Sequence, residues 1–240
     1  MDQSKFSLQN LSDKFNAVVI GASGGIGSAV FDLLSADPRC KQVIGLSRQS
    51  TPSLELMDEG SIAHSCQCVR EAAGDVELIF DATGVLDVGD SGPEKTLRAV
   101  DPAFMAKCLA INAIGPSLLF KHFSDLLPRD RRSVFVTLSA RVGSIGDNKI
   151  GGWISYRASK AALNQIVRTS AIEIQRKRPH AICVALHPGT VATPLSAPYA
   201  GSRDVLTPAR SAKYMLEVLD SLNSDASGGF FAWDGAAVEW

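Results

Sequence analysis

The chain lacks a large excess of charge of either sign. Its 24 Lys and Arg residues are balanced by 25 Asp and Glu residues, which leaves a formal net charge of −1. Such a balance provides no broad positive field for nucleic acid or anionic lipid. The basic run Arg129–Arg132 is short and is interrupted by Asp130. We therefore expect no nucleic acid and no membrane among the partners.

Closely spaced cysteines and long apolar runs are also missing. Of the five cysteines only Cys66 and Cys68 are close, and C-x-C without nearby histidines is a poor metal signature, so we predict no metal site. An odd cysteine count without a framework is typical of reduced thiols in a cytoplasmic protein. The first 16 residues contain no apolar core of signal-peptide length, and no run approaches the roughly 18 residues of a membrane helix. These absences predict a soluble, cytoplasmic protein.

Hydrophobic residues make up 45% of the chain and form short apolar runs that alternate with helical patterns. The runs predict strands at 17–20, 42–47, 53–56, 76–82, 133–139, 181–188 and 230–233, and helices at 25–36, 60–73, 102–127, 155–177 and 208–222. Continuous apolar strands separated by helices are typical of a parallel sheet covered on both faces. We predict one doubly wound, Rossmann-type α/β domain of about seven strands over 17–240, preceded by an N-terminal extension over 1–16.

A glycine-rich turn follows the first predicted strand. Gly21, Gly25 and Gly27 form a G-x-x-x-G-x-G pattern that leads into the first predicted helix. Glycine permits a tight turn and lets a pyrophosphate approach the backbone amides at the helix N-terminus. Helix–strand packing also selects glycine, but the position directly after the first strand favours dinucleotide binding.

The end of the second predicted strand distinguishes NAD from NADP. A carboxylate about 20 residues past the glycine motif binds the ribose of NAD, whereas a nearby arginine accommodates the 2′-phosphate of NADP. Ser47 stands where the acid is expected, and Arg48 follows it. A solvated surface arginine is the alternative interpretation. The missing acid favours NADP(H), with NAD(H) as the second choice of cofactor.

Tyr156 and Lys160 lie four residues apart at the start of a predicted helix, on one face of it. A phenol beside an ammonium is a candidate proton donor, although such pairs also occur on ordinary helix surfaces. The glycine turn, Asn112 of "NAIG", Ser139 of "TLSA", this pair and "PGTVAT" (188–193) follow one another along the chain. In this order they resemble the short-chain dehydrogenase/reductase family from residue 17 to the C-terminus. The segments "SYRASKAALNQ" and "GGFFAWDGAAVEW" resemble its C-factor-like branch, which is named for a role in bacterial cell-to-cell signalling.

The resemblance implies a catalytic group of Asn112, Ser139, Tyr156 and Lys160. Tyr156 would exchange a proton with the substrate oxygen, and Lys160 would favour the phenolate and hold the nicotinamide ribose. Ser139 would orient the substrate oxygen, and the helix backbone at Asn112 would hold a water that links Lys160 to solvent. The implied function is hydride transfer between NADP(H) and a small carbonyl or alcohol substrate. The alternative is an NADP-binding regulatory or signalling protein with little turnover.

The resemblance also implies the contacts of cofactor and substrate. Besides Asn112, Tyr156 and Lys160, the implied cofactor contacts are Gly21, Ser23, Gly25, Ile26, Gly27, Ser47, Arg48, Glu55, Leu56, Ala82, Thr83, Gly84, Pro188, Gly189, Val191 and Thr193. The implied substrate contacts are Ser139, Trp153 and Tyr199. As alternatives, Leu56 and Val191 belong to the core, Thr193 is a turn residue and Trp153 is a packed surface aromatic. The predicted helices 102–127 and 155–177 carry apolar stripes, which in this family implies a homodimer or homotetramer.

Three segments depart from the family pattern. The family's N-N-A-G reads "DATG" (81–84), so both asparagines are lost and the bracing beneath the cofactor must differ. The stretch from Ser139 to Tyr156 is longer than usual and carries "DNKIGGW" (147–153). The segment 194–205, which corresponds to the family's substrate lid, is short and favours a small substrate. We expect His187, at the end of the sixth predicted strand, to be structural.

Overall fold

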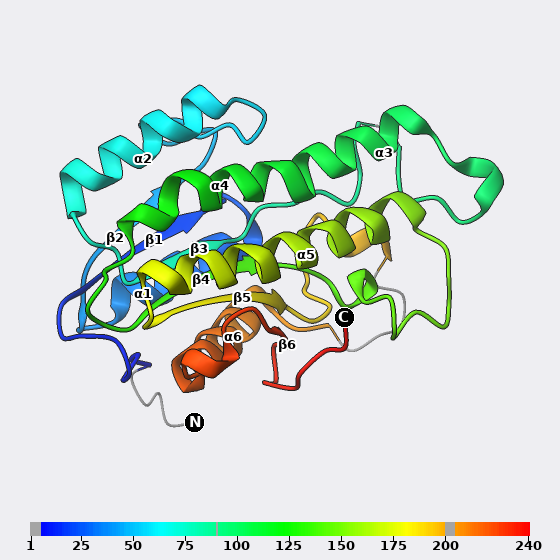
Figure 1. The fold of residues 1–240 in the computed structure, drawn as a ribbon. Helices are drawn as coiled ribbons and strands as arrows, with labels where there is room; N and C mark the ends of the chain where they lie inside the picture. The colour runs from blue at the N-terminus through cyan, green and yellow to red at the C-terminus, as the bar shows by residue number, and fades with distance from the viewer. Residues whose placement is uncertain (1–5, 90, 200–204) are drawn as a thin grey trace.

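A parallel sheet of six strands forms the centre of the molecule (Figure 1). The computed structural model describes residues 6–89, 91–199 and 205–240. The strands are β1 (Phe15–Ile20), β2 (Cys40–Leu46), β3 (Leu78–Asp81), β4 (Ser133–Leu138), β5 (Ala181–His187) and β6 (Phe230–Ala232). They lie in the order β2-β1-β3-β4-β5-β6, and every neighbouring pair is parallel. The chain therefore winds outward from β1 in both directions, as the sequence predicts.

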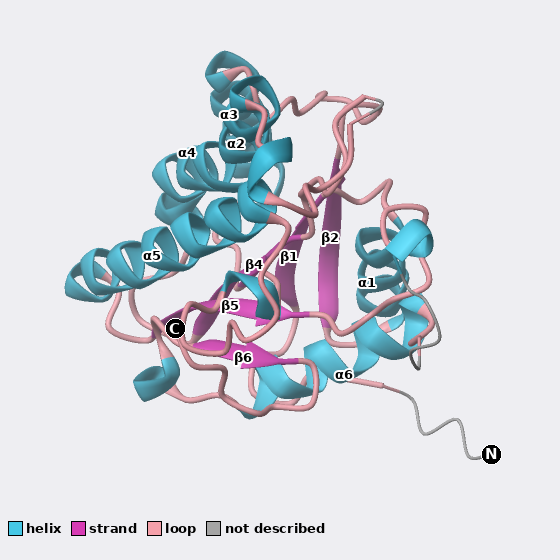
Figure 2. Cartoon of the chain, turned by 90° about the vertical axis from the view of Figure 1, so that its right-hand side faces the viewer, coloured by secondary structure: helices cyan, strands magenta, loops and turns pink. Residues whose placement is uncertain are grey.

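Helices cover both faces of this sheet (Figure 2). They are α1 (Gly25–Ala36), α2 (Glu59–Ala73), α3 (Pro102–Leu109), α4 (Gly115–Phe123), α5 (Ile154–Lys177) and α6 (Pro208–Ser221). Leu34 of α1 and Leu216 of α6 are buried in one core cluster, whereas Phe120 of α4 and Leu163 of α5 belong to the other. Two clusters on opposite faces explain why the central strands, such as β3 and β5, carry apolar residues on both faces instead of alternating.

The third predicted strand, over 53–56, is wrong, because these residues form part of the loop between β2 and α2. A parallel crossover requires about ten or more residues, and only five separate this segment from the strand predicted before it. Hydrogen bonds fold the loop back on itself: the Leu54 amide donates to the Ser47 carbonyl (2.9 Å), and the Ser61 hydroxyl donates to the Ser53 carbonyl (2.9 Å). The loop thereby stays beside the carboxyl end of β2.

The helix predicted over 102–127 contains a π-helical turn, Ala110–Ile114, between α3 and α4. Asn112 lies in this turn, and such turns are frequent at functional sites. Contrary to our expectation, one helical run in the described ranges, Pro102–Leu126, is by length and composition apolar enough to cross a membrane, and 44% of its apolar window is buried. Phe120 stacks on Phe135 of β4 with 4.2 Å between ring centroids. The run therefore packs here as a core helix of the sheet.

The residues just before β1 pack against the face that α1 and α6 cover. Leu8 and Leu11 are buried, and the Arg39 guanidinium donates to the carbonyls of both (2.5 and 2.7 Å). The boundary between an N-terminal extension and the main domain stays a prediction.

Candidate active site

A cavity of about 250 Å³ lies at the carboxyl ends of β1, β2 and β3. Of the predicted cofactor residues it is lined by Gly21, Ser23, Ser47, Arg48, Glu55, Leu56, Ala82, Thr83 and Gly84. The structure thus brings together residues from four separate segments of the sequence. Ligands of doubly wound sheets bind at this edge, where neighbouring crossovers run to opposite faces.

Side chains in place of the glycines of this turn would clash with the surrounding backbone and side chains. Glycine therefore leaves the backbone of the turn open to a ligand. Gly21 adopts a left-handed conformation (φ +83°), and a Cβ on Gly27 would lie 2.2 Å from the Gly21 carbonyl oxygen. A Cβ on Gly25 would lie 2.8 Å from Cγ2 of Thr193, so the turn also contacts the predicted nicotinamide segment. The N-cap of α1 is Gly24, which contributes no side-chain hydrogen bond. These features fit the pyrophosphate of a dinucleotide.

A second cavity, of about 410 Å³, is lined by two of the four predicted catalytic residues, Ser139 and Tyr156, whereas Asn112 and Lys160 line neither cavity. The predicted residues that line it are Ile26, Ser139, Trp153, Tyr156, Pro188, Gly189, Val191, Thr193 and Tyr199. The Trp153 ring meets the rings of Tyr156 and Tyr199 edge to face, with centroid distances of 6.2 and 5.3 Å, and the Tyr199 hydroxyl donates to Asp87. Trp153 is therefore part of the cavity wall. Residues 200–204 of the predicted lid lie outside the described residues.

Helix α5 presents Tyr156, Lys160 and Asn164 at intervals of four residues, on one face. Lys160 is 3% exposed, and its Nζ donates to the Leu138 carbonyl at 2.8 Å and lies 6.0 Å from the Tyr156 ring centroid. The Ser139 hydroxyl donates to Oδ1 of Asn164 at 2.6 Å. The end of β4 and the face of α5 are therefore joined at two points. Sequence reasoning missed Asn164, although its spacing from Lys160 was a usable signal.

Asn112 fixes the segment beneath the first cavity. Its Oδ1 accepts from the Val85 amide (2.8 Å), and its Nδ2 donates to the Val85 carbonyl (2.9 Å) and to Oγ of Ser159 (3.1 Å). A Cβ on Gly84 would lie 3.2 Å both from Asn112 Oδ1 and from Lys160 Nζ. The π-helical turn, the loop after β3 and α5 therefore meet around the Lys160 ammonium.

Asp81 belongs to the divergent "DATG" segment. Its side chain makes hydrogen bonds that hold this segment where the family pattern has asparagines. Its buried carboxylate accepts from the amide and hydroxyl of Thr83 (3.0 and 2.5 Å) and from the hydroxyl of Thr137 (2.6 Å). The carboxylate thereby ties β3 to β4. Its negative charge also favours the charged form of Lys160.

Burial is the main cause of the pKa shifts of Lys160 and Tyr156. It lowers the pKa of Lys160 to about 8, in spite of the opposing charge of Asp81. Burial, with a smaller contribution from Cys108, raises the pKa of Tyr156 above its ordinary value. Our expectation that Lys160 lowers the pKa of Tyr156 is therefore not met, since desolvation of the phenol outweighs an ammonium 6.0 Å from the ring. The phenol therefore keeps its proton at neutral pH.

Sequence reasoning missed the charged part of the second cavity. Arg141, Asp147, Lys149 and Arg157 also line it, as does His187. Burial, followed by the charge of Arg141, lowers the pKa of His187 to about 4, so the imidazole is neutral. Its Nδ1 is buried without a hydrogen-bond partner among the described residues. The described residues contain no group of three or more His, Cys, Asp or Glu side chains that could hold a metal ion.

Comparison with known proteins identifies the family. The family model described as short chain dehydrogenase matches residues 16–203, and the chain belongs to this family. The C-signal protein of Myxococcus xanthus is 37% identical over 172 residues, which cover 70% of this chain and 94% of that protein. This similarity agrees with the predicted C-factor-like branch.

Two further relatives are named for enzymes. The 1-hydroxy-2-glutathionyl-2-methyl-3-butene dehydrogenase of Rhodococcus sp. (strain AD45) is 28% identical over 189 residues, or 79% of each chain. The solved NADPH-bound carbonyl reductase from chicken fatty liver superposes with a TM-score of 0.80 at 25% identity, over 96% of this chain and all of that one. The family and the fold are thus those of oxidoreductases.

Replacing Lys160 by methionine should stabilise the protein at neutral pH. The pKa of Lys160 is about 8 in the folded protein and 10.5 ordinarily, so its charged form opposes folding. This penalty is complete below pH 8, on the order of 3 kcal/mol, and disappears as the pH rises to about 10.5. The lost hydrogen bond to Leu138 offsets about 1 kcal/mol of the gain.

Urea unfolding of both proteins at pH 7 and pH 10 measures this effect. We expect Lys160→Met to be more stable by about 1–2 kcal/mol at pH 7 and to lose that advantage at pH 10. A variant that is destabilised equally at both pH values would show that the ammonium is not desolvated.

Proposed function

We propose that the protein is an NADP(H)-dependent oxidoreductase that transfers a hydride between the nicotinamide and a small carbonyl or alcohol substrate. The observation that carries this proposal is the convergence of Ser139 and Tyr156 on one cavity, with the Lys160 ammonium buried behind them. A protein that only bound a nucleotide would not need two hydroxyl groups, those of Ser139 and Tyr156, on a second cavity. The retained group of polar side chains therefore favours chemistry.

Each residue has a role that its position supports. NADP(H), when bound, supplies or accepts the hydride. Tyr156 donates a proton to the substrate oxygen during reduction, and burial keeps that proton in place beforehand. Ser139 donates a hydrogen bond to the same oxygen once its hydroxyl leaves Asn164. Lys160, which is buried behind both, would hold the nicotinamide ribose.

Arg48 supports the preference for NADP(H). It lines the 250 Å³ cavity beside Ser47, and no acid stands at that position to repel a phosphate. Glu55 lines the same cavity and is the acid whose repulsion Arg48 would have to outweigh. The chicken carbonyl reductase carries NADPH, which agrees with this preference.

A signalling function is the second candidate, because the relative from Myxococcus is named C-signal. On this view the fold binds NADP and acts through a partner with little turnover. Steady oxidation of NADPH by any carbonyl compound would favour the enzyme.

We further propose that the protein acts in the cytoplasm as a homodimer or homotetramer. All five cysteines are free thiols, which fits a reducing compartment. Ile114, in the π-helical turn, and Ile172 of α5 are 56% and 47% exposed. Apolar side chains on these helices would be covered in a two-fold assembly.

Replacing Tyr156 by phenylalanine tests the chemistry. The ring and its contact with Trp153 remain while the transferable proton is lost, so kcat for the best carbonyl substrate should fall at least about 100-fold. NADPH affinity should change by less than about three-fold, because the hydroxyl that is removed acts in proton transfer and the contacts that bind the cofactor remain. Tyr214→Phe is the matched control, since Tyr214 lies on α6 and lines neither cavity. Substantial turnover by Tyr156→Phe would exclude Tyr156 as the acid.

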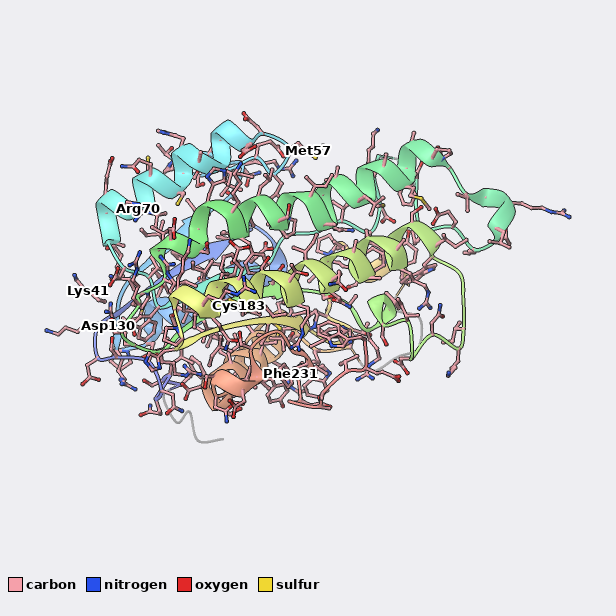
Figure 3. The ribbon with its side chains drawn as sticks, in the orientation of Figure 1. Lys41, Met57, Arg70, Asp130, Cys183 and Phe231 are labelled. Atoms are coloured by element: carbon pink, nitrogen blue, oxygen red, sulfur yellow. The ribbon has the colours of Figure 1, made fainter. Side chains whose placement is uncertain are left out.

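Replacing Arg48 by alanine tests the cofactor preference. A charge-assisted contact to phosphate contributes roughly 1.5–3 kcal/mol, so NADPH should bind the wild type at least about ten-fold more tightly than NADH. Arg48→Ala should weaken NADPH and spare NADH, and Ser47→Asp should reverse the preference by repelling the phosphate. Arg70→Ala is the control, because this exposed arginine of α2 lines neither cavity (Figure 3).

Calorimetric titration of both nucleotides against the four proteins measures these affinities. Equal affinities in the wild type, or a preference that survives Arg48→Ala, would show that Arg48 is a solvated surface residue.

A further inference from the structure

The walls of the 410 Å³ cavity divide into an apolar part and a basic part. Ser139 and Tyr156 contribute the reactive hydroxyl groups. Next to them, the side chains of Leu86, Trp153, Leu195 and Tyr199 form an apolar and aromatic surface. The segment from 141 to 157 adds three cationic side chains, Arg141, Lys149 and Arg157. A cavity of this size accommodates a small molecule and lies near the lower end of the usual range for such sites.

The positive charge of this segment is only partly compensated. Among the described residues, Asp147 is the only acid that lines the cavity, and its carboxylate lies 3.6 Å from the Arg141 guanidinium. The Arg157 guanidinium donates to the backbone carbonyls of Val142, Gly151 and Gly152, which carry no full charge. Lys149 makes no hydrogen bond or ion pair with any residue that the structure describes.

Other acids lie near the cavity but do not line it: the charge of Asp234 acts on His187, and the Glu239 carboxylate lies beside Gly146. Asp87 accepts the Tyr199 hydroxyl, and Glu94 is buried, where it accepts from the amide and hydroxyl of Ser155. Neither carboxylate lines the cavity. His187 is neutral at physiological pH because its pKa is lowered to about 4. Among the described residues, the lining therefore carries three cations against one acid, in a chain whose formal net charge is −1.

We propose that the substrate is a small carbonyl compound with an apolar body and an anionic group, such as a carboxylate, at the end away from the carbonyl. The carbonyl meets Ser139 and Tyr156, the body packs on Trp153 and Tyr199, and Lys149 receives the anion. Lys149 is exposed, so the attraction is that of an ion pair at the surface and is weakened by salt. This inference rests on the proposed oxidoreductase function, because it places the carbonyl at Tyr156.

Binding of 4-carboxybenzaldehyde and of its uncharged methyl ester tests the inference. The two compounds share the aldehyde and the ring and differ only in the charge at the far end. Calorimetry with NADP⁺ present measures their affinities without reduction. We expect the wild type to bind the acid about five- to ten-fold more tightly than the ester, with a difference that shrinks at high salt.

Variants of the segment 141–157 show which residue causes the preference for the acid over the ester. Lys149→Met should abolish most of the preference by weakening the acid and sparing the ester, whereas Asp147→Asn should tighten the acid by removing a competing carboxylate. Lys41→Met is the matched control, because this exposed lysine lies on β2 at the opposite end of the sheet (Figure 3). Equal affinities for acid and ester, no binding of either, or a preference unchanged by Lys149→Met would overturn the inference.

Oxidation of NADPH with the same two compounds separates this inference from the proposed function. Turnover without a preference for the acid would contradict only the charge inference. A preference in binding without any turnover of the acid would contradict its use as a substrate and leave the anion site standing.

Discussion

The buried ammonium of Lys160 is the constraint on which the site depends. A cation removed from water must be surrounded by carbonyl and carboxylate groups, and here the Leu138 carbonyl and the charge of Asp81 provide them. Both groups lie at the carboxyl ends of central strands, so α5 must keep one register over β3 and β4. That register also brings Tyr156 into the second cavity and Asn164 to the Ser139 hydroxyl. The cost in stability and the arrangement that we propose for catalysis thus have the same origin.

The N-terminus of α5 is held as firmly as its middle. Trp153 precedes the helix in a left-handed conformation (φ +54°), which is uncommon for a bulky residue, and its amide donates to the Glu94 carbonyl at 2.5 Å. The Glu94 carboxylate also accepts from the Ser155 amide at 3.1 Å, so a buried acid satisfies one of the free amides at the helix start. Upstream, the Gly146 amide donates to the Trp240 carbonyl at 3.0 Å. The C-terminus and Glu94 together position the segment that carries the basic side chains of the cavity.

Periodic and local features could be predicted from the sequence, and long-range ones could not. The spacing of apolar residues predicted α1 at its observed bounds. The glycine turn predicted the position of the 250 Å³ cavity at the end of β1. The strand predicted over 53–56 failed because its β-like composition conflicts with the short spacing from the strand before it, which leaves no room for a parallel crossover. The brace formed by Asp81 and Thr137 joins residues 56 positions apart, and no local pattern pairs them. The lowered pKa of Lys160 and the raised pKa of Tyr156 are likewise set by burial, which only the packed structure reveals.

The central claim is that this arrangement transfers hydride and does not merely bind a nucleotide. The most direct measurement uses NADPH that is stereospecifically deuterated at C4 of the nicotinamide, incubated with the protein and a mixture of aldehydes and ketones. Mass spectrometry of the alcohols then follows the label. Our account predicts that an alcohol product carries one deuterium from one of the two labelled forms and none from the other. Tight binding of NADPH without label in any alcohol would contradict it and favour a nucleotide-binding regulator.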